Sequence, residues 1–365
     1  MPIEIESPEE LGYDTIDANL AESSFRDQRL SDLGIDVAVD DLLLAYGDHL
    51  GDPDLRRAIA DQAAVDPDEV IVTPGAAAAL FLTATSLLEA GDHAVILRTN
   101  YATNIETPRM IGADIDFLDL DPADGFRLDL DRLAGLIRPE TRLVSLTYPH
   151  NPSGTTIDET ALRQVIDIVE AHGTRLVFDE TYGDMAYGER LPAAAAVGDR
   201  AISVSSLSKT YGLPGLRIGW LLCRDPALRE TLLAAKEQVF ICGATLDEAI
   251  AARVLEQRDR LLPPIREQIA AHLGVVRDWI AGDDRFAWVE PAGGVVAFPW
   301  LRPEAQVDVE RFYTVLNGDL GTYVGPGHWF EQDRRHFRLG FGWPTTEELH
   351  RGLAALSEAA TRSIS

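Results

Sequence analysis

Lysine is almost missing from this chain of 365 residues. Of its 32 lysines and arginines, only Lys209 and Lys236 are lysines. An arginine guanidinium stays charged in proteins, whereas a lysine amine in a dry, positively charged pocket can lose its proton and attack a carbonyl carbon. Chemistry that needs a nucleophilic amine is therefore restricted to these two positions.

Cysteine, long apolar runs and grouped histidines are also scarce. The two cysteines, Cys223 and Cys242, form no C-x-x-C pair, so we expect buried thiols and no disulfide framework. No stretch approaches about 18 uninterrupted apolar residues, so no membrane-spanning helix is expected. The eight histidines have no ligand-like spacing, so no metal site is expected. The acidic segment 1–10 lacks the apolar core of a signal peptide, which favours a cytoplasmic protein.

Acidic residues greatly outnumber basic ones. The formal net charge is −28, from 32 basic and 60 acidic residues. Such a surface repels the phosphates of nucleic acid, so we expect no nucleic-acid partner. Acid spread over the whole chain, together with the loss of lysine, suggests adaptation to a high-salt cytoplasm in which screening is strong. A GC-rich genome would explain the loss of lysine but not the excess of acid.

The remaining composition is that of a large globular protein. With 46% hydrophobic residues, the chain can bury a sizeable core and form two domains. Strand-like and helix-like segments alternate up to about residue 205, which predicts a mostly parallel sheet. Beyond residue 244 the pattern changes to long amphipathic helices at 246–261 and 265–281, then short strand-like segments and a last helix at 347–361.

The segment around Lys209 has the composition of a binding site for a phosphate ester beside an amine. Three hydroxyl residues precede the lysine: Ser205, Ser206 and Ser208. Two glycines follow the lysine, and Arg217 lies eight residues after Lys209. Hydroxyls, a closely approachable glycine backbone and an arginine are groups that bind phosphate. Taken alone, Lys209 could also be a surface loop lysine, and Lys236 is predicted to be a solvated position of a helix.

A second candidate for anion binding follows a short predicted strand at 69–73. Gly75 turns the chain into a helix predicted at 76–89. The backbone N–H groups of Gly75, Ala76 and Ala77 would be free at such a helix start, and an anion can bind to them. An ordinary turn between a strand and a helix would have the same sequence, so both interpretations stay open.

Polar residues also follow two later predicted strands. The strand 142–148 runs into a loop with two prolines, in which Asn151 either points its amide at a ligand or caps the turn. Asp179 directly follows the apolar residues 176–178 of the predicted strand 175–178, where an unpaired charge is costly. We therefore expect Asp179 to have a partner, such as a protonated ring nitrogen.

Four motifs occur in order along the chain. They are Asn151-Pro152-x-Gly154, Asp179-x-x-Tyr182, Ser206-x-Ser208-Lys209 and Arg217-x-Gly219. In this order and spacing the chain, from about residue 46 to residue 338, resembles the class I/II aminotransferases of pyridoxal 5′-phosphate (PLP) fold type I. One such motif is weak evidence, but four in register are highly specific.

The resemblance implies an α/β fold with two domains. The large PLP-binding domain would span 45–250 and contain a mostly parallel seven-stranded sheet sandwiched by helices. A smaller α+β domain would combine 1–44 with 251–365. The resemblance also implies a homodimer with shared active sites, in which Tyr46 reaches the phosphate bound by the neighbouring subunit.

The resemblance further implies a role for each matching residue. Lys209 would hold PLP as an internal aldimine and then move a proton at the substrate α-carbon. Asp179 would pair with the pyridinium nitrogen, and Tyr182 and Asn151 would bind the phenolic oxygen. The residues expected around the phosphate are Gly75, Ala76, Ala77, Ser206, Ser208 and Arg217.

Two more positions would contact the ring and the substrate. Tyr101 falls where the family stacks an aromatic ring on PLP. Arg338, together with Asn151, would bind the substrate carboxylate, with the arginine as a bidentate fork. Taken one by one, Tyr101 and Tyr46 could be core aromatics and Arg338 could form a salt bridge at a strand edge. The four motifs favour the functional interpretation of all three.

The chain departs from the family beside the expected cofactor. Ala76 and Ala77 replace the usual hydroxyl residue, so the turn offers only N–H groups, and Asn100 replaces a proline. On the substrate side, the segment 19–24 is expected near the active site. The candidates for recognising the substrate side chain are Phe25, Asn104, His150 and Trp329.

The implied function is transfer of an amino group between an L-amino acid and a 2-oxo acid. Some relatives with a similar Asn-Leu-Ala-Glu opening resemble enzymes that process arginine-derived amino acids, including a cyclase. A PLP-dependent lyase or cyclase acting on an amino acid is therefore the alternative. All these reactions begin with removal of the α-proton. A non-catalytic PLP-binding sensor is the third hypothesis, but it would need a basic DNA-binding appendage, and residues 1–45 are too short and too acidic to form one.

Overall fold

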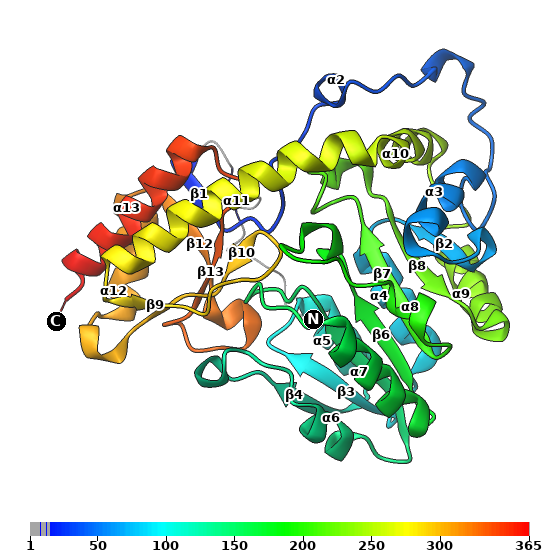
Figure 1. Cartoon of the computed structure of the whole chain (residues 1–365), viewed down its shortest axis with the longest axis horizontal. Coiled ribbons are helices and arrows are strands. Elements are labelled where there is room, and N and C mark those ends of the chain that lie inside the picture. Colours follow the sequence, from blue (N-terminus) through cyan, green and yellow to red (C-terminus); the bar gives the residue numbers. More distant parts are fainter. Residues whose placement is uncertain (1–7, 9–11, 13–14, 365) are drawn as a thin grey trace.

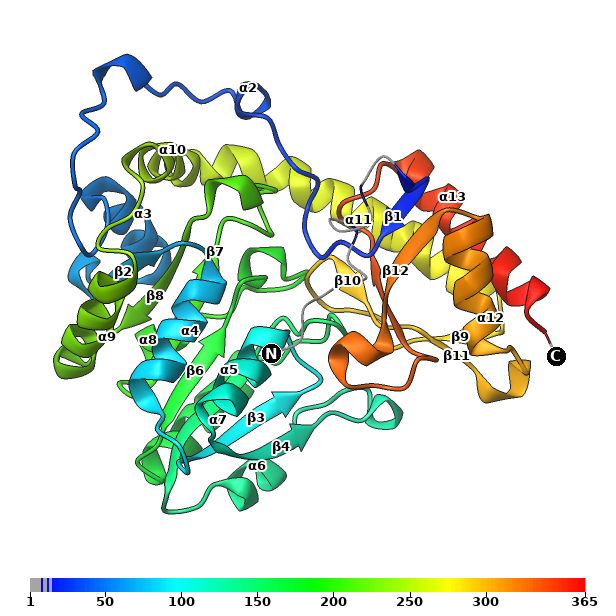
Figure 2. The same cartoon turned by 180° about the vertical axis from the view of Figure 1, so that it is seen from behind.

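The computed structural model describes residue 8, residue 12 and residues 15–364. Most of the acidic segment 1–10, on which the prediction of no signal peptide depends, lies outside the described residues. Among the described helices, none combines the length and the apolar character needed to span a bilayer. Figures 1 and 2 show two main sheets, each with its own helices, and one long helix that runs alongside both.

The larger sheet has seven strands in the order β2-β8-β7-β6-β5-β3-β4. Only β8 runs antiparallel to its neighbours, so the predicted mostly parallel sheet is confirmed. Side chains alternate along each strand: Leu176 and Phe178 of β6 face one layer of helices, and Val177 faces the other. The strands are β2 (Val70–Thr73), β3 (His93–Arg98), β4 (Asp114–Asp119), β5 (Thr141–Thr147), β6 (Arg175–Asp179), β7 (Ala201–Ser206) and β8 (Gly219–Cys223).

Helices cover both faces of this sheet, with α4, α5 and α9 on one face and α6, α7 and α8 on the other. Aspartate side chains cap the first turn of several of them: Asp52 directly precedes α3, Asp158 precedes α7 and Asp225 precedes α9. By contrast, α4 follows Gly75, so no side chain satisfies its first N–H groups. The helices are α2 (Leu30–Leu33), α3 (Pro53–Ala63), α4 (Ala76–Leu87), α5 (Ala102–Ile111), α6 (Leu130–Leu136), α7 (Glu159–Ala171), α8 (Ala194–Val197) and α9 (Pro226–Val239).

The smaller sheet brings the two ends of the chain together. β1 pairs in parallel with β12, and β13 lies between β12 and β10. β1 therefore belongs to the smaller sheet, whereas the assignment of the whole segment 1–44 and the limits of the two domains stay predictions. The strands of this sheet are β1 (Ala18–Leu20), β10 (Val296–Ala297), β12 (Thr322–Pro326) and β13 (Phe337–Gly340). Two further strands, β9 (Phe286–Ala287) and β11 (Trp300–Leu301), pair with each other in a separate sheet. The helices are α12 (Val309–Thr314) and α13 (Thr346–Arg362).

Two consecutive helices, α10 (Thr245–Glu256) and α11 (Arg258–Gly282), connect the sheets (Figure 1). The predicted helices 246–261 and 265–281 stop on either side of Pro263 and Pro264. That boundary is wrong, because α11 runs through both prolines and the chain breaks at Gln257. Each proline removes one helix hydrogen bond, but buried apolar side chains on both sides of the pair offset the loss.

Two predictions about burial are wrong. Lys236 is not solvated: its side chain is 0% exposed, and its amine donates a hydrogen bond to the backbone oxygen of His49. Burial lowers the pKa of Lys236, and the buried carboxylate of Glu248 opposes this shift. The segment that contains His49 lies 187 residues earlier and covers the helix face that holds Lys236. Cys242 is partly exposed, whereas Cys223 is buried as predicted.

Glu180 is a further buried charge, directly after β6. Burial raises its pKa to about 7, although the charge of Arg190 and a hydrogen bond with Ser203 oppose the shift. The folded state therefore holds this proton more tightly than the unfolded chain, in which the pKa is about 4.5. The stability gained from this difference is complete below pH 4.5 and is lost as the pH rises to about 7.

We expect Lys236→Met to lower the free energy of unfolding by about 1–3 kcal/mol, because the carbonyl of His49 would lose its buried donor. Denaturant unfolding measures the change. The matched control is Glu230→Gln, an exposed position of the same helix, which should change stability by less than about 0.5 kcal/mol. If Lys236→Met behaved like this control, the buried position of Lys236 would be disproved.

For Glu180→Gln we expect the stability relative to the natural chain to rise with pH. Near pH 5 both side chains are neutral, whereas at pH 8 the natural chain carries a buried charge that the variant lacks. The difference between the two unfolding free energies should grow by up to about 3 kcal/mol between pH 5 and pH 8. The control is Glu140→Gln, at an exposed position, and the difference between its unfolding free energy and that of the natural chain should not change with pH. A flat difference for Glu180→Gln as well would contradict the raised pKa.

Candidate active site

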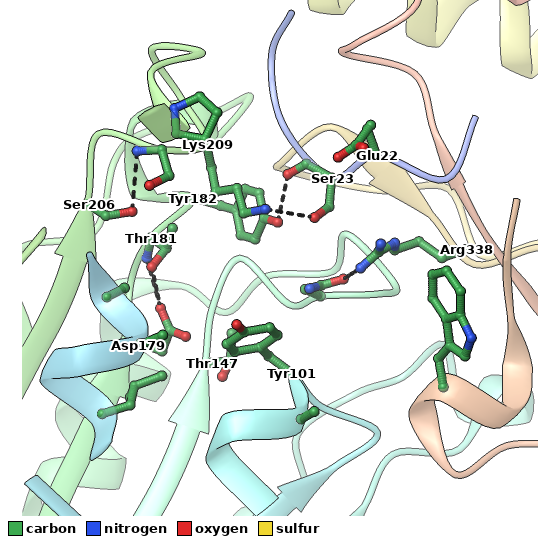
Figure 3. A pocket seen from close by; sticks show the side chains of 18 of the residues that line it. Glu22, Ser23, Tyr101, Thr147, Asp179, Thr181, Tyr182, Ser206, Lys209 and Arg338 are labelled. Carbon is green, nitrogen blue, oxygen red and sulfur yellow. Dashed lines mark hydrogen bonds between the residues drawn. The ribbon is translucent and has the colours of Figure 1, made fainter. Parts of the chain in front are cut away.

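A cavity of about 280 Å³ opens at the carboxyl edge of the larger sheet. Its floor lies where three neighbouring parallel strands end, with Thr147 closing β5, Asp179 closing β6 and Ser206 closing β7. Figure 3 shows Arg338 facing this edge from the smaller sheet. The residues predicted from the sequence that line the cavity are Ala76, Ala77, Tyr101, Asn151, Asp179, Tyr182, Ser206, Ser208, Lys209, Arg217 and Arg338.

Lys209 projects into the cavity from the loop after β7 (Figure 3). Its Nζ donates a hydrogen bond to Oγ of Ser23 at 3.2 Å, and its backbone oxygen accepts one from the N–H of Phe25 at 2.8 Å. Gly212, three residues later, has a φ of +62°, and a Cβ there would lie 2.1 Å from the carbonyl oxygen of Arg26. The lysine loop and the N-terminal segment therefore hold each other in place.

Asp179 lies at the bottom of the cavity and is 5% exposed. Its Oδ1 accepts hydrogen bonds from the backbone N–H of Thr181 at 3.1 Å and from the Thr181 hydroxyl at 2.6 Å. Burial raises the pKa of Asp179, whereas hydrogen bonds from Thr181 and Asn104 and the charge of Lys209 lower it. A positively charged group beside Asp179 would strengthen the charged form of this carboxyl group.

The start of α4 forms one wall with Arg217. Gly75 does not line the cavity, but it has a φ of +83°, and a Cβ there would lie 2.6 Å from Nη2 of Arg217. A Cβ on Gly219 would lie 2.5 Å from the backbone nitrogen of Ala76. The guanidinium of Arg217 also donates to the carbonyl of Pro74 at 3.3 Å. Two glycines thus allow an arginine and uncapped N–H groups to meet at one place, as an anion site requires.

Arg338 stands on the opposite wall, on β13. Its Nη1 donates to Oδ1 of Asn151 at 3.3 Å, and its Nη2 donates to the carbonyl oxygen of Ala21 at 2.7 Å. The guanidinium carbon lies 5.1 Å from the centre of the Phe330 ring. These contacts fix the guanidinium between the loop after β5 and the N-terminal segment, where it faces the cavity.

Three tyrosines had predicted roles, and the structure places two of them in the cavity. The hydroxyl of Tyr182 donates to the carbonyl oxygen of Ser23 at 2.8 Å, and burial raises its pKa to about 12. Tyr101 directly precedes α5 and is 38% exposed. Tyr46 is 82% exposed and does not line the cavity of its own chain.

Of the four residues predicted to recognise a substrate side chain, only Trp329 lines the cavity. His150 is buried behind it, with Nε2 2.6 Å from the carbonyl oxygen of Thr99, and burial lowers its pKa to about 4. Phe25 belongs to the core around the smaller sheet. Asn104 is buried behind Asp179. These three predictions are wrong, because the local sequence did not reveal on which side of the loop or helix each side chain lies.

The cavity also contains residues without a predicted role: Glu22, Ser23, Thr147, Thr181 and Phe330. The first two belong to the segment 19–24, which was expected near the active site. Thr147 is the second-last residue of the predicted strand 142–148, and its position before the predicted Asn151 loop could have identified it. No signal in the sequence distinguishes Phe330 from a core residue.

Comparison with known proteins agrees with this geometry. Residues 24–356 match the family model described as aminotransferase class I and II. Capreomycidine synthase from Streptomyces vinaceus is 34% identical over 88% of this chain and 82% of the synthase. An arginine–pyruvate transaminase from Pseudomonas aeruginosa is 28% identical over 84% of this chain and 81% of the transaminase. The crystal structure of a PLP-dependent cyclase has a TM-score of 0.90 and 31% identity, covering 99% of this chain and 97% of the cyclase.

The match covers most of the chain, and the fold and the lysine loop agree with it. This protein therefore belongs to the class I and II aminotransferase family, whose members depend on PLP.

Proposed function

We propose that this protein is an aminotransferase that moves an amino group between an L-amino acid and a 2-oxo acid, with Lys209 as its catalytic base. The observation that carries the proposal is that the Lys209 amine shares one cavity with Asp179, Arg217 and Arg338. The chain has only one other lysine, and that residue is fully buried elsewhere.

The residues of the cavity fit PLP. Lys209 supplies the amine that attaches to an aldehyde, and Asp179 supplies a buried carboxyl group for a protonated ring nitrogen. Arg217 and the uncapped start of α4 supply a phosphate site. At Gly75 and Gly219 a Cβ would fill the space that brings these groups together. We propose that these residues hold the cofactor.

The acid–base step depends on groups of the chain itself. When bound, PLP supplies an electron-withdrawing ring that stabilises negative charge at the substrate α-carbon. Lys209 would take the proton from that carbon, and the Ser23 hydroxyl, 3.2 Å from Nζ, would keep the amine inside the cavity. Tyr182 is held by the carbonyl of Ser23 and stays neutral, since its pKa is about 12.

Arg338 and Asn151 would orient the substrate. A guanidinium binds a carboxylate with two parallel hydrogen bonds, which fixes direction as well as position. The contacts of Arg338 with Asn151 and Ala21 hold it in advance, so little side-chain entropy is lost on binding. The α-carbon of a bound amino acid would then lie between Arg338 and Lys209.

We also infer that the protein works as a homodimer. Leu43, Leu44 and Tyr46 are between 79% and 82% exposed, and they stand close together on the segment before α3. Apolar side chains so exposed in one segment are typical of a surface that a partner covers. Tyr46 would then contribute to the cavity of the second subunit.

A second candidate is cyclisation or elimination on an amino acid. It is favoured by the similarity to capreomycidine synthase and to the PLP-dependent cyclase. Both functions begin with removal of the α-proton by the same lysine, so the groups of this cavity serve either one. The two differ in whether the amino group of the first substrate is passed on to a 2-oxo acid.

We expect Lys209→Ala to lose the covalent attachment of PLP and to lower activity by at least about 10²–10⁴-fold, because the general base is removed. Borohydride reduction of the natural holoenzyme, followed by peptide mass mapping, should place the cofactor on Lys209 and not on Lys236. The folded fraction of Lys236→Met is the control and should keep the attachment. Attachment at position 236, or none at all, would refute the assignment.

The reaction type is tested by supplying the holoenzyme with a panel of L-amino acids, with and without pyruvate. Aminotransfer predicts one molecule of alanine for each 2-oxo acid formed, and without pyruvate consumption should stop at one amino acid per active site. Sustained turnover without pyruvate, with cyclic or unsaturated products, would support the second candidate instead. Absence of both results across the panel would overturn the enzyme assignment.

A further inference from the structure

The charges that line the cavity exceed those that the proposed reaction needs. Among the described residues, five charged side chains line it: Glu22, Asp179, Lys209, Arg217 and Arg338. Asp179, Lys209 and Arg217 serve the cofactor in the proposed function, and Arg338 serves the α-carboxylate of the substrate. Glu22 has no role in binding or activating these common parts.

We infer that Glu22 is the specificity residue of this site and binds a positive charge, preferably a guanidinium, on the side chain of the amino-acid substrate. This inference rests on the proposed function, because it takes Arg338 as the residue that binds the α-carboxylate. With that group fixed, the part of the substrate that still varies is its side chain. A carboxylate placed beside it attracts a cation and repels an acidic side chain.

The backbone at Glu22 is held on three sides. β1 ends two residues earlier and pairs with β12, and the carbonyl of Ala21 accepts the hydrogen bond from Arg338 at 2.7 Å. Gly340 packs directly against the backbone of Glu22. A Cβ on Gly340 would lie 1.8 Å from the Glu22 carbonyl oxygen, so only glycine permits this close packing. The Asn19 side chain donates to Oε1 of Glu22 at 3.5 Å. The carboxylate is therefore presented from a rigid support, as recognition requires.

Glu22 lies on the substrate side of the cavity. Figure 3 shows it beside Ser23 and near Arg338, away from Asp179. It is half-buried, so an ion pair there would be partly shielded from water. Trp329 lines the same cavity, and both it and Arg338 lie within 3.4 Å of the position that a Cβ on Gly325 would take, so it offers an aromatic face on the Arg338 side. A planar guanidinium stacks on such a face more readily than an ammonium does, which favours arginine-like side chains.

The cost of binding a neutral side chain strengthens the preference of this site for a positively charged substrate side chain. A neutral group that covers Glu22 would remove water from the carboxylate and return no charge. A hydrogen bond between two charged groups is stronger than one to a neutral group, and the difference in strength corresponds to about 10–100-fold in affinity. The transaminase among the similar proteins is named for arginine, which agrees with this choice.

The test compares L-arginine with L-citrulline, a neutral molecule of nearly the same shape. Steady-state kcat/KM is measured with the holoenzymes of the natural chain, Glu22→Gln and the exposed control Glu140→Gln. We expect the natural chain to prefer L-arginine by about 10–100-fold. Glu22→Gln should lose most of this preference by losing activity with L-arginine, while kcat/KM for L-citrulline changes by less than about threefold. Glu140→Gln should match the natural chain.

A binding measurement separates this inference from the proposed reaction. α-Methyl-L-arginine has no α-proton, so its dissociation constant is measured without turnover, by titration of the cofactor absorbance. We expect Glu22→Gln to weaken its binding by about 10–100-fold. That result would support the inference even if aminotransfer failed. Unchanged binding, no binding to the natural chain, or equal losses for L-arginine and L-citrulline would each overturn it.

Discussion

The site depends on one geometric constraint, that parallel strands of a sheet end at the same edge. Strands buried on both faces are mostly apolar along their length, so the polar residues that can reach a ligand gather where the strands stop. Thr147, Asp179 and Ser206 are the last residues of three adjacent strands, and Thr147 pairs directly with Asp179. The loops after these strands carry Asn151 and Lys209 to the same place. The parallel topology thus collects residues that are far apart in the sequence into one cavity.

The smaller sheet supplies the opposite wall of that cavity. β1 pairs with β12 and leads the N-terminal segment past the lysine loop, where Ser23 contacts both Lys209 and Tyr182. Arg338 on β13 is tied to the same segment through Ala21. The two sheets therefore have different proposed roles: the larger one carries the groups proposed for the cofactor, and the smaller one carries Arg338, proposed for the substrate carboxylate.

The sequence predicted local features well and long-range ones poorly. The order of strands and helices was predictable from alternating patterns, and the lysine loop from its composition. The burial of Lys236 could not be predicted, because the segment around His49 that covers it is distant in the sequence. His150 was misplaced for a related reason: its partner, the carbonyl of Thr99, belongs to another loop. Periodicity describes one element at a time, whereas burial depends on what packs against that element.

The same division explains how related chains could differ in reaction while sharing a first step. Removal of the α-proton needs only the lysine, the buried carboxyl group and a fixed α-carboxylate, which the larger sheet and Arg338 provide. The later steps depend on the substrate side chain, since a leaving group or a nucleophile within it decides whether elimination or ring closure competes with aminotransfer. Glu22 and Trp329 line the cavity from elements outside the larger sheet, where the proposed substrate side chain would lie. Changes there can alter the substrate, and with it the outcome, without disturbing the residues that act on the α-carbon.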